Sequence, residues 1–331
     1  MRRFEYARPE TEAEALEMLN DHGGNTAVLA GGTDLISLMK RELVTPDRVV
    51  DLKNVPTLTE IREEDGGVRI GSLVTLQDMQ RHPLLTEYQS LGHVIDGIRS
   101  IQIQHMGTLG GDVCHLPNCW YFRSGYGLLA IDKGVSLVET GDNRYHAVFG
   151  NQGAAKFVSA SRFAPGLIAW GASVQVIGPD PNQSESIPLE YFYITPKMAQ
   201  QGVAVLKPGQ LISHIWLPAA GQRQSAAYEV LQMEGLDWPL AAAAACVEIE
   251  GGVVRSVKIV MGHVAPTPWV ATAAGKILLG KPLTVDAAAQ AADIAVSQAT
   301  PLSNNGYKVQ LARTAVKRAL LKAIGHSEGG I

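Results

Sequence analysis

Two Gly-Gly pairs, each with a threonine and an aspartate close by, are the residues of this sequence best suited to hold a ligand. Glycine lets the main chain turn tightly and lets a ligand touch it, because no Cβ stands in the way. A helix that begins just after such a turn offers free N–H groups to an anion. We therefore predict two clamps on one phosphate-bearing ligand, formed by Leu29-Ala30-Gly31-Gly32-Thr33-Asp34-Leu35 and Gly107-Thr108-Leu109-Gly110-Gly111-Asp112.

Either Gly-Gly pair alone is more often only a turn, because glycine is a common turn residue whether or not a ligand is near. Two pairs with the same kinds of neighbour weaken that interpretation. Neither pair belongs to a common phosphate-binding motif, since no Gly-x-Gly-x-x-Gly opens a helix and no Gly-Lys-Ser/Thr follows.

The cysteines are few and do not predict a metal centre. Cys114 and Cys119 flank His115, but a metal site needs about four ligands and this set is incomplete. Cys246 lies in an alanine-rich run and is expected in the core. Three cysteines argue against a disulfide scaffold and fit a reducing compartment. A catalytic cysteine is not supported, because no orienting partner stands out in the sequence.

Composition excludes several classes of protein. The 331 residues suffice for two or three domains, and 46% hydrophobic with 18% charged residues indicate a globular chain. A net charge of −4 without a Lys/Arg block disfavours nucleic-acid binding. The N-terminus lacks an apolar stretch of signal-peptide length, and the longest apolar run, residues 239–247, is too short to span a bilayer. We expect a cytoplasmic protein without membrane insertion.

The elements around the glycine pairs follow from local patterns. Thr11 to Glu14 predicts a capping box that opens a helix, and Gly23-Gly24 would end that helix. Strands at 26–30 and 48–52 enclose a short helix, which predicts a parallel strand–helix–strand unit. Thr75 should cap a helix over 76–82. Further strands are predicted at 68–71, 167–176, 185–192 and 211–217, with an irregular passage over 101–119 and a long surface excursion over 119–153.

A small polar linker near residues 219–222 is followed by a different pattern of predicted elements. Three antiparallel strands are predicted at 226–232, 240–249 and 253–261, with Gly251-Gly252 as a hairpin turn. Two helices, over 285–298 and 307–324, should close the chain, the second with a helical apolar stripe.

The two glycine segments together resemble the FAD-binding medium subunit of molybdenum hydroxylases, the family of xanthine dehydrogenase, carbon monoxide dehydrogenase and aldehyde oxidoreductase. The resemblance covers nearly the whole chain. Phe4-Glu5-Tyr6 and Pro9 are similar to the family's N-terminal signature, and Gly262-His263-Val264-Ala265-Pro266-Thr267-Pro268 is similar to its Gly-Gly-Val-Ala-Pro-Thr-Pro segment.

The resemblance implies an α+β fold: a two-part FAD-binding fold of the vanillyl-alcohol oxidase (PCMH) type, followed by a small α+β domain like the C-terminal domain of the CO dehydrogenase flavoprotein. It places a small α/β subdomain at residues 1–55 and a second FAD-binding subdomain at 56–218, with a long insertion near 114–155. The C-terminal domain would occupy residues 222–326.

The resemblance also implies the cofactor and its ligands. Both glycine segments would wrap the FAD pyrophosphate and ribityl chain, mostly through main-chain N–H groups, and Ile98 with Arg99 would pack against the flavin. The cofactor-binding residues implied are Leu29, Ala30, Gly31, Gly32, Thr33, Asp34, Leu35, Ile98, Thr108, Leu109, Gly110, Gly111 and Asp112. No residue of this chain is expected to act as an acid or base, because the cofactor carries the redox chemistry.

The expected partners are a molybdopterin-binding large subunit and a [2Fe-2S] small subunit, giving a heterotrimer. Electrons would pass from the [2Fe-2S] clusters through FAD to an external acceptor. Three alternatives stay open: a self-sufficient FAD-dependent oxidase, for which the chain after the linker looks too short, a flavin-free assembly or binding module, and a version of this subunit that bears a [4Fe-4S] cluster.

Two departures from the family pattern matter. Some members hold a [4Fe-4S] cluster on four cysteines of the insertion, but here Cys119 is the only one retained and Ala155 stands where the last ligand would be. We therefore expect the insertion without the cluster. Arg162 occupies a position where the family usually has aspartate near the flavin, which would alter a flavin hydrogen bond or its potential.

Overall fold

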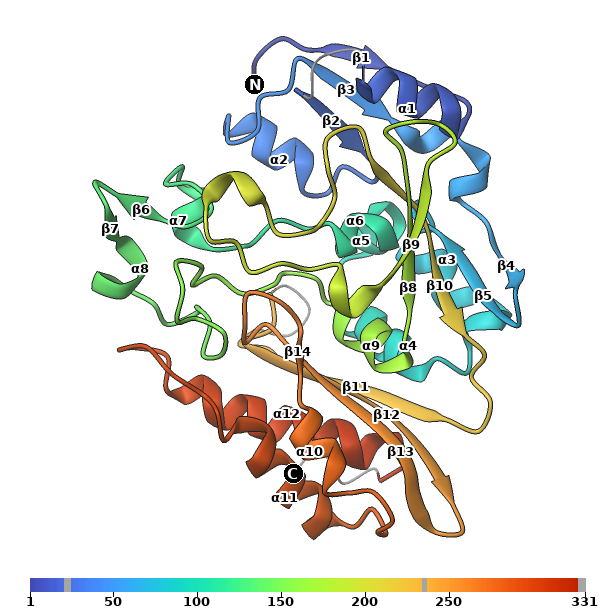
Figure 1. The fold of residues 1–331 in the computed structure, drawn as a ribbon, viewed down its shortest axis with the longest axis vertical. Coiled ribbons are helices and arrows are strands. Elements are labelled where there is room, and N and C mark those ends of the chain that lie inside the picture. The colour runs from blue at the N-terminus through green and yellow to red at the C-terminus, as the bar shows by residue number, and fades with distance from the viewer. Residues whose placement is uncertain (21–24, 234–236, 327–331) are drawn as a thin grey trace.

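The computed structural model describes residues 1–20, 25–233 and 237–326. The described strands form sheets of three, five and four strands and one two-stranded hairpin. Figure 1 shows the three-stranded sheet at one end of the molecule, the five-stranded sheet in the middle and the four-stranded sheet at the other end. Helices and strands are mixed throughout, which confirms the predicted α+β class.

The N-terminal sheet is parallel. Its central strand β3 (Arg48–Asp51) pairs with β1 (Glu5–Ala7) on one side and with β2 (Thr26–Leu29) on the other. Helix α2 (Leu35–Lys40) connects β2 to β3, so the predicted strand–helix–strand unit is confirmed. Strand β1 was not predicted, because three residues are too few to show an alternating pattern.

Helix α1 (Glu12–Asn20) packs against this sheet through Ala15, Leu16 and Leu19. Half of the predicted capping box is present, since the Glu14 N–H donates to Thr11 Oγ1 over 3.2 Å. The Glu14 carboxylate accepts instead from the N–H of Glu10, one residue before Thr11. The predicted end at Gly23-Gly24 lies outside the described residues.

The middle sheet is antiparallel, and its strands occur in the order β4 (Ile61–Glu64), β5 (Gly67–Gly71), β10 (Leu211–Pro218), β8 (Ser173–Ile177) and β9 (Ser184–Pro188). Five helices belong to this part: α3 (Leu76–Arg81), α4 (Gln89–Gly97), α5 (Ile101–Met106), α6 (Leu109–Val113) and α9 (Ala164–Trp170). Thr75 caps α3 as predicted, accepting from the N–H of Asp78. Helices α4 and α9 pack between this sheet and the C-terminal one, within one continuous core.

Three predictions in this part are wrong. The strand predicted at 167–176 is helix α9 followed by β8: Pro165 opens the helix, and Gly171, at φ +81°, ends it. All seven residues of α9 are buried, so the run shows no period that separates helix from strand. The strand predicted at 185–192 ends at Pro188 and continues as a 3₁₀ turn. The passage 101–119, predicted as irregular, contains α5 and α6.

The C-terminal sheet confirms the three predicted strands as β11 (Gln224–Val230), β12 (Ala241–Glu250) and β13 (Val253–Gly262), and it also contains the short β14 (Trp269–Val270), which was not predicted. Alanines of β12 alternate between two cores: Ala244 faces helices α4 and α9, whereas Ala243 and Ala245 face the C-terminal helices. Small side chains let helices approach both faces of this strand. The C-terminal helices are α10 (Thr272–Lys276), α11 (Val285–Val296) and α12 (Tyr307–Ala323), and the last two of them were predicted.

The insertion lies at one side of the molecule in Figure 1 and carries α7 (Trp120–Arg123), the hairpin β6 (Ile131–Asp132) with β7 (Val135–Ser136), and α8 (Leu137–Thr140). Its predicted surface character is wrong toward its end, where Ala147, Val148 and Phe149 are fully buried. These residues join the C-terminal core, and the N–H groups of Val148 and Phe149 both donate to the carbonyl of Val264.

Lys308 in α12 fastens the insertion to the C-terminal sheet. It is 1% exposed, and its Nζ donates to the carbonyls of Tyr145, His146 and His263 over 3.1, 3.1 and 2.9 Å. Burial lowers the pKa of Lys308 to about 7. We expect Lys308→Met to lower the free energy of unfolding by about 3 kcal/mol, because buried carbonyls lose their donor. Urea denaturation measures this loss.

The matched control is Lys276→Met, which changes an exposed lysine of α10. That variant should stay within about 0.5 kcal/mol of the parent protein. Equal stability of the two variants would contradict the anchoring role of Lys308.

Candidate functional site

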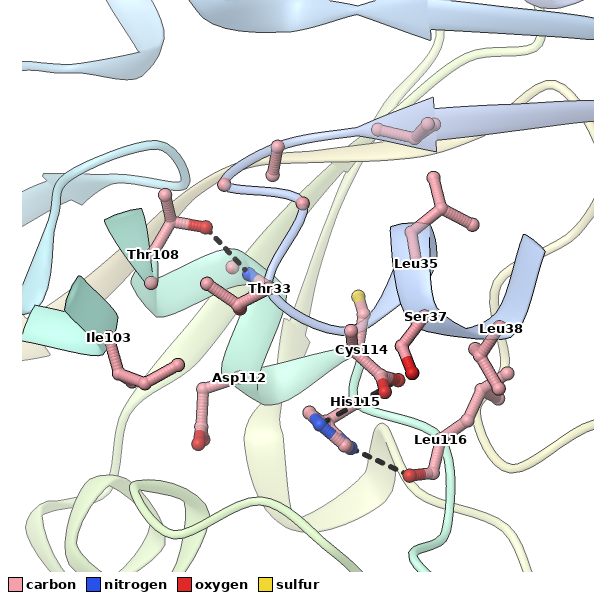
Figure 2. Close-up of a pocket in the computed structure, with 18 of the residues that line it drawn as sticks. Thr33, Leu35, Ser37, Leu38, Ile103, Thr108, Asp112, Cys114, His115 and Leu116 are labelled. Atoms are coloured by element: carbon pink, nitrogen blue, oxygen red, sulfur yellow. Dashed lines mark hydrogen bonds and ion pairs between the residues drawn. The ribbon is translucent and has the colours of Figure 1, made fainter. Parts of the chain in front are cut away.

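A cavity of about 940 Å³ lies where the N-terminal sheet meets the helices of the middle sheet, and both glycine segments line it. Figure 2 shows this cavity, with Thr33 of the first segment and Thr108 of the second on its wall. Its volume is at the upper end of the range for ligand sites, roughly 300–1,000 Å³. The predicted residues that line it are Ala30, Gly31, Gly32, Thr33, Asp34, Leu35, Ile98, Thr108, Gly110, Gly111 and Asp112.

Two predicted residues lie elsewhere. Leu109 is fully buried in the middle core, and the Leu29 side chain packs beside Gly32 at the end of β2. Both support the glycine segments from behind, so their part in the site is indirect.

The first glycine segment passes very close to the second. A Cβ on Gly31 would lie 1.6 Å from the carbonyl oxygen of Met106, at the end of α5. Gly32 has φ +73°, a conformation that residues with a Cβ rarely adopt. In the described part of the chain, the N–H groups from Gly31 to Asp34 donate no hydrogen bond to the protein. This turn therefore combines bare main chain with donors that are free for an anion.

The second segment differs from the predicted loop, because Gly110 and Gly111 form the first turn of α6. Thr108 caps this helix: the N–H of Gly111 donates to Thr108 Oγ1 over 3.2 Å (Figure 2). The N–H of Gly110 donates to the carbonyl of Ser72 over 2.8 Å. The main-chain donors of this turn are thus already used, and its glycines serve close packing: a Cβ on Gly110 would lie 2.6 Å from that of Ser72.

The two aspartates hold the walls of the cavity together. The Asp34 carboxylate forms a two-pronged ion pair with Arg123, at 2.5 and 3.3 Å, and lies 3.6 Å from His115 Nε2. Arg123 also donates to the carbonyls of Leu116 and Pro117, over 3.0 Å each. The start of the insertion is thereby tied to the first glycine segment.

Asp112 anchors the segment that precedes α9. It accepts from Ser161 Oγ and from the N–H groups of Arg162 and Phe163, the latter two over 3.1 Å. Figure 2 shows its carboxylate pointing away from Thr33. Burial raises the pKa of Asp112, and these hydrogen bonds oppose the shift.

Arg162 lines the cavity and pairs with Glu229 of β11. Its Nε lies 2.9 Å from Glu229 Oε1, its Nη2 contacts the other carboxylate oxygen, and both side chains are less than 10% exposed. Arg162 stands out in the sequence as a departure from the family pattern, whereas Glu229 has no such signal, since no local pattern connects residues so far apart.

The cysteines do not gather around a metal. Cys114 lines the cavity, and burial raises the pKa of its thiol to about 12. Cys119 packs against an apolar cluster of Leu129, Ala155 and Phe157. Ala155 stands where the last cysteine ligand of a [4Fe-4S] cluster would be, so apolar side chains fill the space around that position. Within the described ranges, no group of three histidine, cysteine, aspartate or glutamate side chains is placed to hold a metal ion.

The fold and this cavity define a class of protein, and comparison with known families identifies it. Residues 2–220 match the FAD binding domain in molybdopterin dehydrogenase, and residues 226–323 match the CO dehydrogenase flavoprotein C-terminal domain. The chain belongs to the family of FAD-binding subunits of molybdenum hydroxylases, which confirms the resemblance and the predicted two-part fold.

Individual relatives agree. The carbon monoxide dehydrogenase medium chain of Hydrogenophaga pseudoflava is 27% identical over 96% of both chains, and the aldehyde oxidoreductase FAD-binding subunit PaoB of Escherichia coli is 29% identical over 98% of this chain and 99% of its own. A solved structure of the carbon monoxide dehydrogenase from Hydrogenophaga pseudoflava, in a form that lacks the Mo-pyranopterin moiety of the molybdenum cofactor, matches this chain over 98% of both chains with a TM-score of 0.76 and 27% identity.

Proposed function

We propose that this chain is the FAD-binding electron-transfer subunit of a molybdenum hydroxylase-type complex. The observation that carries the proposal is the meeting of two glycine segments on one large cavity, within a chain that belongs to a family of FAD-binding subunits. When bound, FAD would supply the electron transfer between [2Fe-2S] clusters of a partner and an external acceptor.

The residues of the cavity fit this cofactor. The free N–H groups from Gly31 to Asp34 would receive the pyrophosphate, because they are the unused main-chain donors at this wall. Gly111, which is exposed at the start of α6, would let the cofactor approach that helix closely, and Ile98 would supply an apolar contact. No side chain is asked to transfer a proton.

The proposed partners are a molybdopterin-binding large subunit and a [2Fe-2S] small subunit. Support comes from the relatives, which are named as medium chains of carbon monoxide dehydrogenases and as an FAD-binding subunit of an aldehyde oxidoreductase. We further propose a cytoplasmic location, and subdomains at 1–55, 56–218 and 222–326. Among the described residues, no helix has the length and apolar character needed to cross a membrane.

The absorption spectrum of the purified chain tests the proposal. We expect bound flavin, or flavin that the protein takes up when FAD is added, in a one-to-one ratio. Failure to bind FAD would overturn the proposal, and substrate oxidation by the isolated chain would favour a self-sufficient oxidase instead.

Arg123→Ala tests the link between the insertion and the first glycine segment. Without the guanidinium, Asp34 loses its two-pronged partner and the free donors of the turn lose their fixed orientation. We expect the dissociation constant of FAD to rise about tenfold, which is a loss of about 1.4 kcal/mol of binding free energy. Titration of FAD-free protein, followed by flavin fluorescence, measures the dissociation constant.

The matched control is Arg62→Ala, which removes an exposed arginine paired with Glu60 and Glu64 on β4, outside the cavity. Its affinity for FAD should equal that of the parent protein. An equal affinity for Arg123→Ala would show that the ion pair does not position the turn.

A further inference from the structure

A buried carboxylate lies where the parallel strands of the N-terminal sheet end, next to the first glycine segment. Asp51 is the last residue of β3, and its side chain is 5% exposed. Its partner in the neighbouring strand β2 is Leu29, after which the chain continues directly into Ala30 and Gly31. Ligands of parallel sheets bind outside the carboxyl ends of the strands, so Asp51 lies at the edge where the cofactor is expected.

Asp51 binds two other side chains at this edge. It accepts from the Tyr6 hydroxyl of β1 and from the main-chain N–H of Lys53, the latter over 3.1 Å. Lys53 Nζ lies 2.7 Å from Asp51 Oδ1. Burial raises the pKa of Asp51, but the hydrogen bonds from Lys53 and Tyr6 outweigh that effect and hold this pKa below its ordinary value. Asp51 is therefore ionised at pH 7, and it holds the ammonium of Lys53 in place.

The ammonium of Lys53 also reaches the first glycine segment. Its Nζ donates to the carbonyl oxygen of Ala30 over 3.3 Å. The peptide unit that carries this oxygen also carries the N–H of Gly31, and a planar trans peptide points its C=O and its N–H in opposite directions. Lys53 therefore fixes the direction of a donor that has no acceptor in the described part of the chain. Ala30 and Gly31 line the cofactor cavity, so this donor lies at its wall.

The same contact strengthens the donor. A cation at the carbonyl oxygen draws electron density from the amide, and hydrogen bonds that follow one another in a chain polarise each other. The chain here runs from Tyr6 through Asp51 and Lys53 to the carbonyl of Ala30, and it ends at the N–H of Gly31. An ionised acceptor gains most from such a donor, because hydrogen bonds to charged groups are the strong ones.

We propose that Lys53 is a positioning residue for the cofactor, which orients and polarises the Gly31 N–H for the pyrophosphate of FAD. This inference rests on the proposed function. Lys53 does not need to touch the cofactor itself, because its effect passes through the peptide between Ala30 and Gly31. Tyr6 and Asp51 hold its ammonium in the position that this role requires.

Titration of FAD-free full-length protein with FAD, followed by flavin fluorescence, tests the proposal. Lys53→Met removes the ammonium, and we expect the dissociation constant to rise about tenfold. Lys53→Arg keeps a cationic donor for both Asp51 and the Ala30 carbonyl, so it should restore most of the affinity. Tyr6→Phe removes only the hydroxyl that orients Asp51 and should raise the dissociation constant about threefold.

Lys258→Met serves as the control, because Lys258 also pairs with a carboxylate, that of Glu190 at 2.6 Å, and its side chain is 34% exposed against 42% for Lys53. It lies in β13, away from the residues that line the cavity, and its loss should leave FAD affinity unchanged. Unchanged affinity of Lys53→Met, or a loss that Lys53→Arg does not restore, would overturn the proposal.

Melting curves show whether each variant is folded. If Lys53→Met does not fold, Tyr6→Phe decides, and FAD affinity equal to that of the parent protein then contradicts the role of Lys53. A parent protein that binds no FAD overturns the proposed function and this inference with it. A parent protein that binds FAD no more tightly than folded Lys53→Met contradicts the positioning role alone.

Discussion

Gly31→Ala should abolish FAD binding at micromolar concentrations of the cofactor. The added Cβ would lie 1.6 Å from the Met106 carbonyl oxygen and 2.7 Å from its carbon, both rigid main-chain atoms. The turn must therefore move away from α5, and the free N–H groups of Gly32 and Thr33 move with it. We expect affinity to fall on the order of a hundredfold, about 2.7 kcal/mol, as measured by FAD titration of the cofactor-free protein.

Gly92→Ala is the matched control for this substitution. Gly92 lies within α4, and a Cβ there would meet no atom within 4 Å. Alanine favours helix more than glycine does, so this variant should gain about 0.5–1 kcal/mol of stability and bind FAD unchanged. A Gly31→Ala protein that binds FAD as tightly as Gly92→Ala would remove the reason for placing the cofactor at this turn.

Local sequence patterns correctly predicted helix caps and hairpin turns, because these features depend on a few neighbouring residues. Thr75 caps α3, and Gly251-Gly252 closes the β12–β13 hairpin with both residues at positive φ. Helix α9 shows the limit of such patterns. It is buried on every side, so a continuous apolar run carries no period, and only the tertiary packing decides that it is a helix.

The site could be predicted in part for a similar reason. Glycine pairs mark positions where the main chain must pass close to something, and the sequence shows them without showing what approaches. At Gly31 the neighbour is Met106, and at Gly110 it is Ser72; both contacts depend on how distant segments pack. The same holds for Arg123, which lies far along the chain from Asp34 and had no local signal.

The sequence predicted free main-chain N–H donors in both glycine segments, and this prediction is wrong for the second segment. A glycine pair before a helix predicts free N–H groups, and the first segment has them. The second segment uses its own, because Thr108 Oγ1 and the Ser72 carbonyl accept from Gly111 and Gly110. Equal-looking motifs thus fill different roles: one offers hydrogen bonds, and the other offers a close main-chain surface.

Arg162→Leu should destabilise the cofactor-free protein by about 3–5 kcal/mol, the usual effect of removing one partner of a buried ion pair. Glu229 would keep a carboxyl group with a 7% exposed side chain and no guanidinium beside it. Burial already raises the pKa of Glu229, and Arg162 opposes that shift, so its loss favours the protonated acid. Urea denaturation should be done without FAD, because a ligand that binds only the folded state would mask the loss.

The double variant Arg162→Leu/Glu229→Leu separates two effects of losing Arg162: the loss of its attraction to Glu229, and the cost of leaving the buried Glu229 carboxylate without a partner. Replacing both partners by apolar side chains removes the buried carboxylate, so most of the stability lost in Arg162→Leu should return. A double variant no more stable than Arg162→Leu would mean that the pair contributes mainly through its packing between the start of α9 and β11. If stability returns while FAD affinity stays low, then the guanidinium matters to the cavity it lines rather than to the fold, and the two roles of Arg162 are separated in one measurement series.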